Sequence, residues 1–113
     1  MLDDLDDSDL DELPFGVVCL DESMTVVRMN RAESEASGIQ RWRVIGRDFF
    51  GDIAPGPTNR ALAEHVRVFA TERHKRDLRI EHTFKRRAGA DPTTIELVRG
   101  RGAGRLYLCI HRD

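Results

Sequence analysis

The chain has few cysteines and no long apolar run. Its two cysteines, Cys19 and Cys109, are too few for a disulfide framework, lack metal-ligand spacing and lie in apolar, strand-like runs. We therefore expect two reduced, mostly buried thiols and no metal site. No apolar stretch is long enough to span a membrane, and the acidic first twelve residues are unlike a secretory signal. We expect a cytoplasmic protein without a membrane partner.

Positive charge is missing from the first twelve residues. They hold seven of the chain's 20 acidic residues and none of its 18 lysines and arginines, which leaves 13 acids and 18 bases, or +5, for the remainder. This asymmetry allows the segment to lie against the basic body or against a partner's basic surface, and a solvated tail is the alternative. Two basic clusters, at residues 73–76 and 85–87, are interpreted as solvated turns, and we expect no nucleic-acid partner.

What remains is the composition of one globular domain, with 113 residues, 40% of them apolar and 34% charged. Periodicity and turn residues predict a short helix, two strands, three helices and three strands. They cover residues 8–13, 15–20, 25–29, 30–37, 41–44, 59–72, 78–85, 93–99 and 105–111. This order predicts an α+β fold in which helices cover one face of a mixed antiparallel sheet. Residues 1–13 form an acidic N-terminal segment with a short helix, and residues 14–113 form the domain.

The other face of the sheet is expected to be apolar near the last strand. Alternate residues of that strand should face the core, and the remainder should point outward beside the first strand. An apolar outer face needs a cover, which is either the N-terminal segment with its leucines or a second subunit. We therefore interpret this outer sheet face as an interaction surface. The candidate residues are Leu5, Leu10, Val17, Cys19, Tyr107, Cys109 and His111.

Three segments carry a resemblance to a known family. They are "LPFGVVCLDESMTVVRMNRAE", "VIGRDFFGDIAP" and "IEHTF", and they occur in order at near-constant spacing. Together they closely resemble the photoactive yellow proteins, blue-light receptors of the PAS family whose chromophore is a p-coumaric acid thioester. The resemblance covers about residues 10–113. It implies a PAS fold, a five-stranded antiparallel sheet with helices covering one face.

The chain departs from these receptors at the chromophore. By the resemblance, Gly56 stands where they have the cysteine that bears the thioester, and Met29 where a tyrosine bonds to the chromophore. Glu33 is retained, Ser37 replaces a threonine and Ile39 replaces a shielding arginine. Because glycine has no thiol, we expect no light chemistry and no cofactor. The residues expected around the remaining cavity are Met29, Glu33, Ser37, Ile39, Val44, Phe50 and Gly56.

Several of these expectations have alternatives. Side chains usually fill an internal void, so a closed core is the alternative to a ligand-sized cavity. Glu33 is either a buried carboxyl with a raised pKa or a helix-surface carboxylate near a helix N-terminus. His65 lies on the apolar face of its helix with Leu62, Val66 and Phe69, which is similar to haem-binding PAS domains. A partly buried, hydrogen-bonded histidine is the other interpretation.

No nucleophile, base and oxyanion set converges in the sequence, so we expect no enzyme. The function predicted is a chromophore-free PAS signalling or protein-interaction module. It would dimerise, or dock on a cytoplasmic signalling protein, through the outer sheet face and the N-terminal segment. The first alternative is a sensor that binds a small ligand or haem in the cavity. Two others are a thiol sensor using Cys19 and Cys109, and an enzyme with Glu33 as its base.

Overall fold

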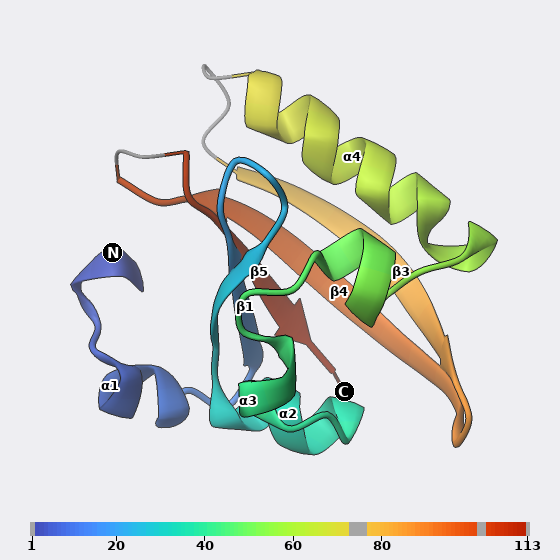
Figure 1. Ribbon diagram of the computed structural model, residues 1–113, viewed down its shortest axis with the longest axis horizontal. Coiled ribbons are helices and arrows are strands. Elements are labelled where there is room, and N and C mark those ends of the chain that lie inside the picture. Colours follow the sequence, from blue (N-terminus) through green and yellow to red (C-terminus); the bar gives the residue numbers. More distant parts are fainter. Residues whose placement is uncertain (1, 73–76, 102–103, 113) are drawn as a thin grey trace.

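The computed structural model describes residues 2–72, 77–101 and 104–112, and a single antiparallel sheet runs through its centre (Figure 1). The strands are β1 (Gly16–Leu20), β2 (Val26–Met29), β3 (Asp77–Arg86), β4 (Gly89–Arg99) and β5 (Leu106–His111). Their order is β2-β1-β5-β4-β3, and every pair of neighbours is antiparallel. The predicted five-stranded α+β fold is confirmed. The basic cluster predicted at residues 73–76 lies outside the described residues.

Helical segments pack on both sides of this sheet. The segments that follow β2 are α2 (Arg31–Ser37), α3 (Arg41–Val44), the π-helical turn η2 (Phe49–Ile53), the 3-10 turn η3 (Pro57–Asn59) and α4 (Arg60–Thr71). The segments that precede β1 are the 3-10 turn η1 (Leu2–Asp4) and α1 (Asp7–Asp11). Val18 and Leu20 of β1 pack in the main core with α4, whereas Val17 and Cys19 pack with the N-terminal leucines. Because alternate strand residues face opposite sides, the N-terminal segment (here residues 2–13) covers the outer sheet face.

Local signals set the ends of α2. The Asn30 side chain accepts a hydrogen bond from the Glu33 amide, 3.1 Å away, as the N-cap of the helix. Gly38 ends the helix with a φ of 75°, a left-handed conformation that suits glycine. The short helix predicted at residues 8–13 is shifted toward the N-terminus: α1 is capped by Asp6, whose side chain accepts from the Asp9 amide, whereas Ser8, with which the predicted helix begins, lies inside α1. Both residue types cap helices well, so the sequence alone did not separate them.

The β3–β4 hairpin is longer than predicted. β4 begins at Gly89 and includes Pro92, which pairs with Thr83, whereas the sequence suggested a turn there. β5 pairs with β4 only from Thr94 onward, so Pro92 lies where β4 has a single neighbour. Proline is tolerated at such an edge because one side of the strand needs no amide donor.

The buried face of α4 is also shifted from the prediction. Leu62, Val66 and Phe69 are buried as expected, but His65 is exposed and Ala63 is buried in its place. The helix therefore turns its small alanine toward the core and its histidine toward solvent. His65 does not line the cavity described below.

Candidate functional site

A cavity of about 240 Å³ lies between the helical layer and the inner face of the sheet. Seven of its twelve lining residues have apolar side chains, and the other five are polar or charged. It is lined by Met29, Glu33, Ser37, Ile39, Phe49, Ile53, Ala54, Pro55, Asn59, Phe84, Lys85 and Arg86. Four of the seven residues predicted to surround a cavity, namely Met29, Glu33, Ser37 and Ile39, are among them. The space is thus present and not filled by side chains.

The other three predicted cavity residues lie elsewhere. Val44 is fully buried in the core, and Phe50 is half-buried against that core. Phe49 faces the cavity in place of Phe50, because the π-helical turn η2 closes with a bond from the Ala54 amide to the Phe49 carbonyl and rotates the pair. Gly56 is exposed with a φ of 98°, and a Cβ placed there would have no atom within 4 Å. A side chain at this position would point into open space.

Glu33 belongs to a closed network of two carboxylates and two guanidiniums at one end of the cavity. Arg112 forks onto Glu33, with Nη1 to Oε1 at 2.8 Å and Nη2 to Oε2 at 3.3 Å. Its Nε and Nη2 also donate to Asp91 at 2.9 and 3.0 Å. Arg86 donates to Asp91 at 3.0 Å and lies 4.0 Å from Glu33. Two negative and two positive charges therefore neutralise one another.

Burial raises the pKa of Glu33, while the hydrogen bond and charge of Arg112 and the charge of Arg86 act in the opposite direction. The hydrogen bond from Arg112 lowers the pKa of Asp91. Of the two alternatives drawn from the sequence, Glu33 is therefore the buried carboxyl with a raised pKa and not the helix-surface carboxylate. Both of its oxygens are engaged by arginines, which leaves no free carboxylate to act as a catalytic base toward the cavity.

Glycine at position 16 makes the site of Glu33 possible. A Cβ placed on Gly16 would lie 2.1 Å from Glu33 Oε1. The carboxylate thus occupies space beside β1 that any side chain would fill. Sequence reasoning missed this close approach and also the arginine partners, because Arg112 is 79 residues from Glu33.

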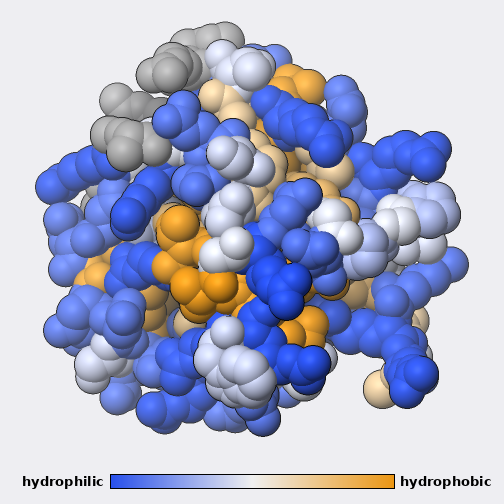
Figure 2. Space-filling view, in the orientation of Figure 1, coloured by the Kyte–Doolittle hydropathy of each residue, from blue (hydrophilic) through white to orange (hydrophobic). Residues whose placement is uncertain are grey.

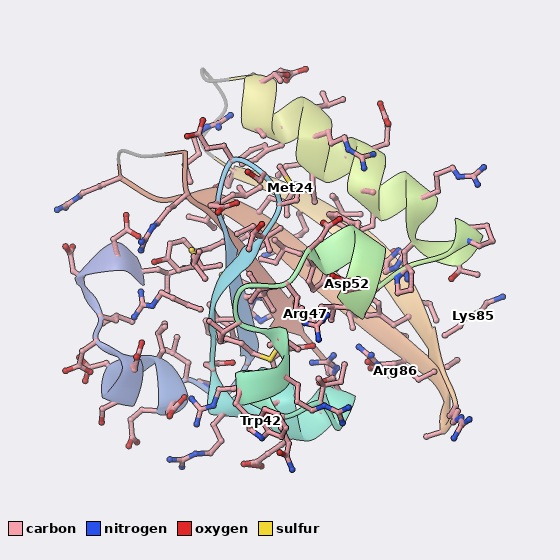
Figure 3. All side chains as sticks on the ribbon, in the orientation of Figure 1. Met24, Trp42, Arg47, Asp52, Lys85 and Arg86 are labelled. Atoms are coloured by element: carbon pink, nitrogen blue, oxygen red, sulfur yellow. The ribbon has the colours of Figure 1, made fainter. Side chains whose placement is uncertain are left out.

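The cations at the cavity differ in direction. Figure 3 shows Lys85 pointing away from the body of the protein and Arg86 pointing inward. The Arg86 guanidinium carbon lies 4.8 Å from the centre of the Phe84 ring, a cation–π contact at the cavity wall. Asn59 also lines the cavity, where it is buried and its Oδ1 lies 2.8 Å from His82 Nε2. Burial lowers the pKa of His82, which favours the neutral ring.

The outer sheet face is covered by the chain's own N-terminal segment. Leu10, Val17, Cys19 and Tyr107 form one buried cluster, at most 1% exposed, and half-buried apolar residues surround it. The sequence allowed either the N-terminal segment or a second subunit as the cover of this face, and in the structure the N-terminal segment covers it. The half of the face formed by β3 and β4 carries mainly polar outward residues, such as Arg79, Glu81, Thr94 and Glu96.

The predicted interface residues lie beneath or beside this cover. Leu10, Val17, Cys19, Tyr107 and Cys109 are buried and are not a free surface. Leu5 is half-buried against the cluster, and His111 is half-buried with its ring centre 4.5 Å from that of Phe15. A docking role for these residues requires the segment to move, and it remains a prediction.

Arg28 holds the segment at its polar centre. Its guanidinium donates to the Leu5 carbonyl at 2.6 Å, the Tyr107 hydroxyl at 2.9 Å, the Leu2 carbonyl at 3.3 Å and the Asp7 carboxylate at 3.3 Å. The Tyr107 hydroxyl in turn donates to Asp3 at 2.6 Å. Burial and the hydrogen bond to Asp3 raise the pKa of Tyr107, so its hydroxyl stays protonated and available as a donor.

The other end of the segment is tied to α2 and α3. Asp11 accepts two hydrogen bonds from Arg41, at 2.8 and 3.0 Å, and one from the Arg31 amide at 2.8 Å. The buried Asn30 donates to the Leu10 carbonyl at 2.9 Å. The acidic segment therefore lies on the basic body of the same chain. The charge distribution also allowed a partner's basic surface or a solvated tail.

The two thiols lie in the sheet. Cys19 and Cys109 are buried on the neighbouring strands β1 and β5, where Cys19 pairs with Tyr107 and Cys109 with Val17. Burial raises the pKa of Cys19 to about 11 and that of Cys109 to about 12. A protonated, buried thiol is a poor nucleophile, so this environment does not favour a thiol sensor. No three metal-ligating side chains gather among the residues that the structure describes.

Comparison with known proteins agrees with the fold. The sequence matches the family described as the PAS fold over residues 10–108, so the chain belongs to that family. Within it the chain is similar to photoactive yellow protein. The chain is 46% identical to the photoactive yellow protein of Rhodothalassium salexigens in a match that covers 46% of this chain. It is 43% identical to that of Halochromatium salexigens in a match that covers 48% of this chain. These matches cover 42% and 43% of the two relatives, so the chain spans less than half of their length.

Solved structures extend the likeness over the whole domain. The photoactive yellow protein domain of the sensor histidine kinase Ppr from Rhodospirillum centenum superposes with a TM-score of 0.86 at 27% identity, over 97% of this chain and 96% of that one. The PAS domain of the RpfR quorum-sensing receptor from Cronobacter turicensis, in complex with BDSF, has a TM-score of 0.72 at 22% identity, over 89% and 95%. The second likeness shows the shared fold. No helix in the described part of the chain is long and apolar enough to cross a membrane.

Proposed function

We propose that the chain is a non-enzymatic PAS signalling module that passes its signal by contact. The contact surface is the N-terminal segment together with the outer sheet face beneath it, and the partner is a cytoplasmic signalling protein. The observation that carries the proposal is the acidic segment that lies on an apolar patch and is held by arginines. A cover of this kind hides a docking surface until it is released.

The contacts at the edges of the segment are weak enough to open. The ion pair of Asp4 with Arg101 lies largely in solvent, since these side chains are 52% and 67% exposed, and Asp7 is 87% exposed at its pair with Arg28. Exposed pairs of this kind contribute about 0–1 kcal/mol each. Release would uncover Val17, Cys19 and Tyr107, an apolar patch that favours a protein partner.

The resemblance to photoactive yellow protein does not require light detection here. Gly56 has no thiol to carry a thioester, and the two cysteines lie in strands rather than beside the cavity. Glu33, the acidic residue among those lining the cavity, is engaged by Arg112 and is not free to act as a general base. Both points favour a contact-based module over a photoreceptor or an enzyme.

Release of the segment tests the proposal. Arg28→Ala removes four contacts to the segment and to Tyr107 and should speed amide hydrogen exchange over residues 2–13 by about tenfold or more. Arg101→Ala is the matched control, since it removes an exposed ion pair but keeps the backbone amide bonded to Asp3. The same partner should be captured from the native cytoplasm more strongly by Arg28→Ala, and Tyr107→Asp in that background should abolish capture. The proposal is contradicted if Arg28→Ala leaves the hydrogen exchange of residues 2–13 unchanged, or if Tyr107→Asp does not reduce capture of the partner.

A small-molecule sensor is the second candidate, because the cavity is formed and combines apolar lining residues with polar and charged groups. Its volume of about 240 Å³ lies below the roughly 300–1,000 Å³ of drug-sized sites, so the ligand would be compact. His65 is exposed and does not line the cavity, so it does not offer a haem ligand there. Native mass spectrometry of the protein from its own cells should show a bound mass that Ile39→Trp, which fills the cavity, removes. A ligand-free mass in both proteins would exclude this candidate.

A further inference from the structure

The most exposed large apolar side chains described in the structure gather at α3. Trp42, the only tryptophan of the chain, is 75% exposed, and Ile45 is 46% exposed. They are three residues apart, which places them on one side of this turn. Val44 between them is fully buried and anchors the turn in the core. The Trp42 indole N–H donates to the Gln40 side chain, so the ring is held as a projecting knob.

A groove lies directly beside this knob. Its volume is about 580 Å³, and it is lined by the apolar Ile39 and Ile53 together with polar and charged side chains. Trp42 stands on its rim. Figure 2 shows apolar surface near α3, broken up by hydrophilic side chains. A hollow of this size has room for an indole ring, since pockets of roughly 300–1,000 Å³ hold drug-sized molecules.

The groove also carries unpaired charges of both signs. Arg43, Arg47 and Asp52 line it, and Figure 3 shows Arg47 and Asp52 on the same side of the molecule. The Arg43 guanidinium carbon lies 5.7 Å from the centre of the Trp42 ring. Within the described residues, none of these three side chains has an ion-pair partner, whereas the neighbouring Arg41 is paired with Asp11. A partner that fits must therefore supply an anion and a cation.

We infer that this α3 face, made of Trp42, Ile45 and the groove, is the contact between two copies of the chain related by a two-fold axis. A knob beside a hollow is self-complementary under such an axis, because the Trp42 of each copy enters the groove of the other. Arg47 of each copy then faces Asp52 of its partner. A purely acidic peptide would leave Asp52 unpaired, which is why a second copy fits better. This contact does not use the outer sheet face and does not depend on release of the N-terminal segment.

Sedimentation velocity and intrinsic fluorescence test the contact directly. Since Trp42 is the only tryptophan, its emission should shift to the blue as the concentration rises and the dimer forms. Trp42→Ala should weaken the dimer by at least about 30-fold, as expected of a buried interface tryptophan. Val68→Ala is the matched control, because Val68 is the other large exposed apolar residue and lies on α4. It should leave the dimer unchanged.

A charge exchange tests the two-fold pairing. Arg47→Asp and Asp52→Arg should each weaken the dimer by about tenfold, since each places like charges opposite one another in both symmetric contacts. An equal mixture of the two variants should recover the wild-type affinity, because both contacts of the mixed dimer are then attractive. A wild-type chain that stays monomeric at about 200 µM overturns the inference, even if it binds an acidic peptide through Trp42. So does a dimer that Trp42→Ala leaves intact or a mixture that is not rescued.

Discussion

Gly16→Ala should break the pairing of Glu33 without changing either charge. A Cβ at Gly16 would lie 2.1 Å from Glu33 Oε1 and 3.1 Å from Glu33 Cβ. Gly16 is not among the glycines with a positive φ, so its backbone can accept alanine. The Glu33 side chain therefore has to give way, and we expect its carboxylate to swing away from Arg112 toward solvent.

The size of the loss follows from the network. Breaking a buried charge pair costs about 3–5 kcal/mol when one partner is left unpaired. Arg112 keeps its hydrogen bonds to Asp91, so the lower end, about 3 kcal/mol, is expected for Gly16→Ala. Glu33→Ala removes the same pair and should cost a similar amount. Because both changes act on one contact, the double variant should cost about as much as either alone, a coupling of about 2–3 kcal/mol.

Urea unfolding followed by far-ultraviolet circular dichroism measures these free energies. Tryptophan fluorescence is unsuitable, since the exposed Trp42 reports poorly on the core. If the costs of Gly16→Ala and Glu33→Ala add to within about 0.5 kcal/mol, the alanine perturbs β1 itself and the argument about Glu33 fails.

Three further predictions concern the segment, the thiols and the loop. Burial acts to raise the pKa of Asp3 and Asp11, but hydrogen bonds outweigh it, so both pKa values lie below the ordinary 3.8. The two carboxylates therefore stabilise the docked segment fully above about pH 4, and this stabilisation is lost as the pH falls through the lowered pKa values. Hydrogen exchange over residues 2–13, corrected for its intrinsic pH dependence, should therefore rise in acid, and a flat profile would count against this anchoring. Cys19 and Cys109 should resist a disulfide reagent at about pH 8 until urea unfolds the chain, and rapid native labelling would show that they are accessible. Gly56→Ala should lower the free energy of unfolding by about 1–2 kcal/mol through its φ of 98° alone, and an unchanged urea midpoint would contradict that.

The elements that the sequence predicted well are those set by local patterns. Asn30 and Gly38 bound α2 because a capping side chain and a left-handed glycine act within a few residues. Alternation in the last strand placed Leu108 inward and Tyr107 outward, as the two packing clusters show. The exchange of Phe49 for Phe50 escaped prediction because a π-helical turn adds one residue without a distinctive sequence signal.

The partners in the site depended on contacts between distant parts of the chain. Glu33 could be assigned to the cavity from the resemblance, but nothing local identifies Arg112, which meets it only after β5 returns beside β1. The sequence also did not decide what covers the outer sheet face. The leucines at residues 5, 10 and 13 and a second subunit could each cover the same apolar patch. The side chain of Arg28 settles the choice by reaching the backbone of the segment.

The cavity and the proposed docking surface share one short stretch of chain. Arg28, at the end of β2, holds the N-terminal segment, and the next residue, Met29, lines the cavity. Asn30 binds the Leu10 carbonyl with its amide and, with its side-chain oxygen, the amide of Glu33. A ligand that displaced Met29 would therefore act on Arg28 and Asn30 through one peptide bond each, and one that displaced Glu33 would act on Asn30 through the hydrogen bond to its side chain. If the cavity binds a ligand, its effect should be read first in the exchange of residues 2–13, because a change in those contacts requires no movement of the sheet.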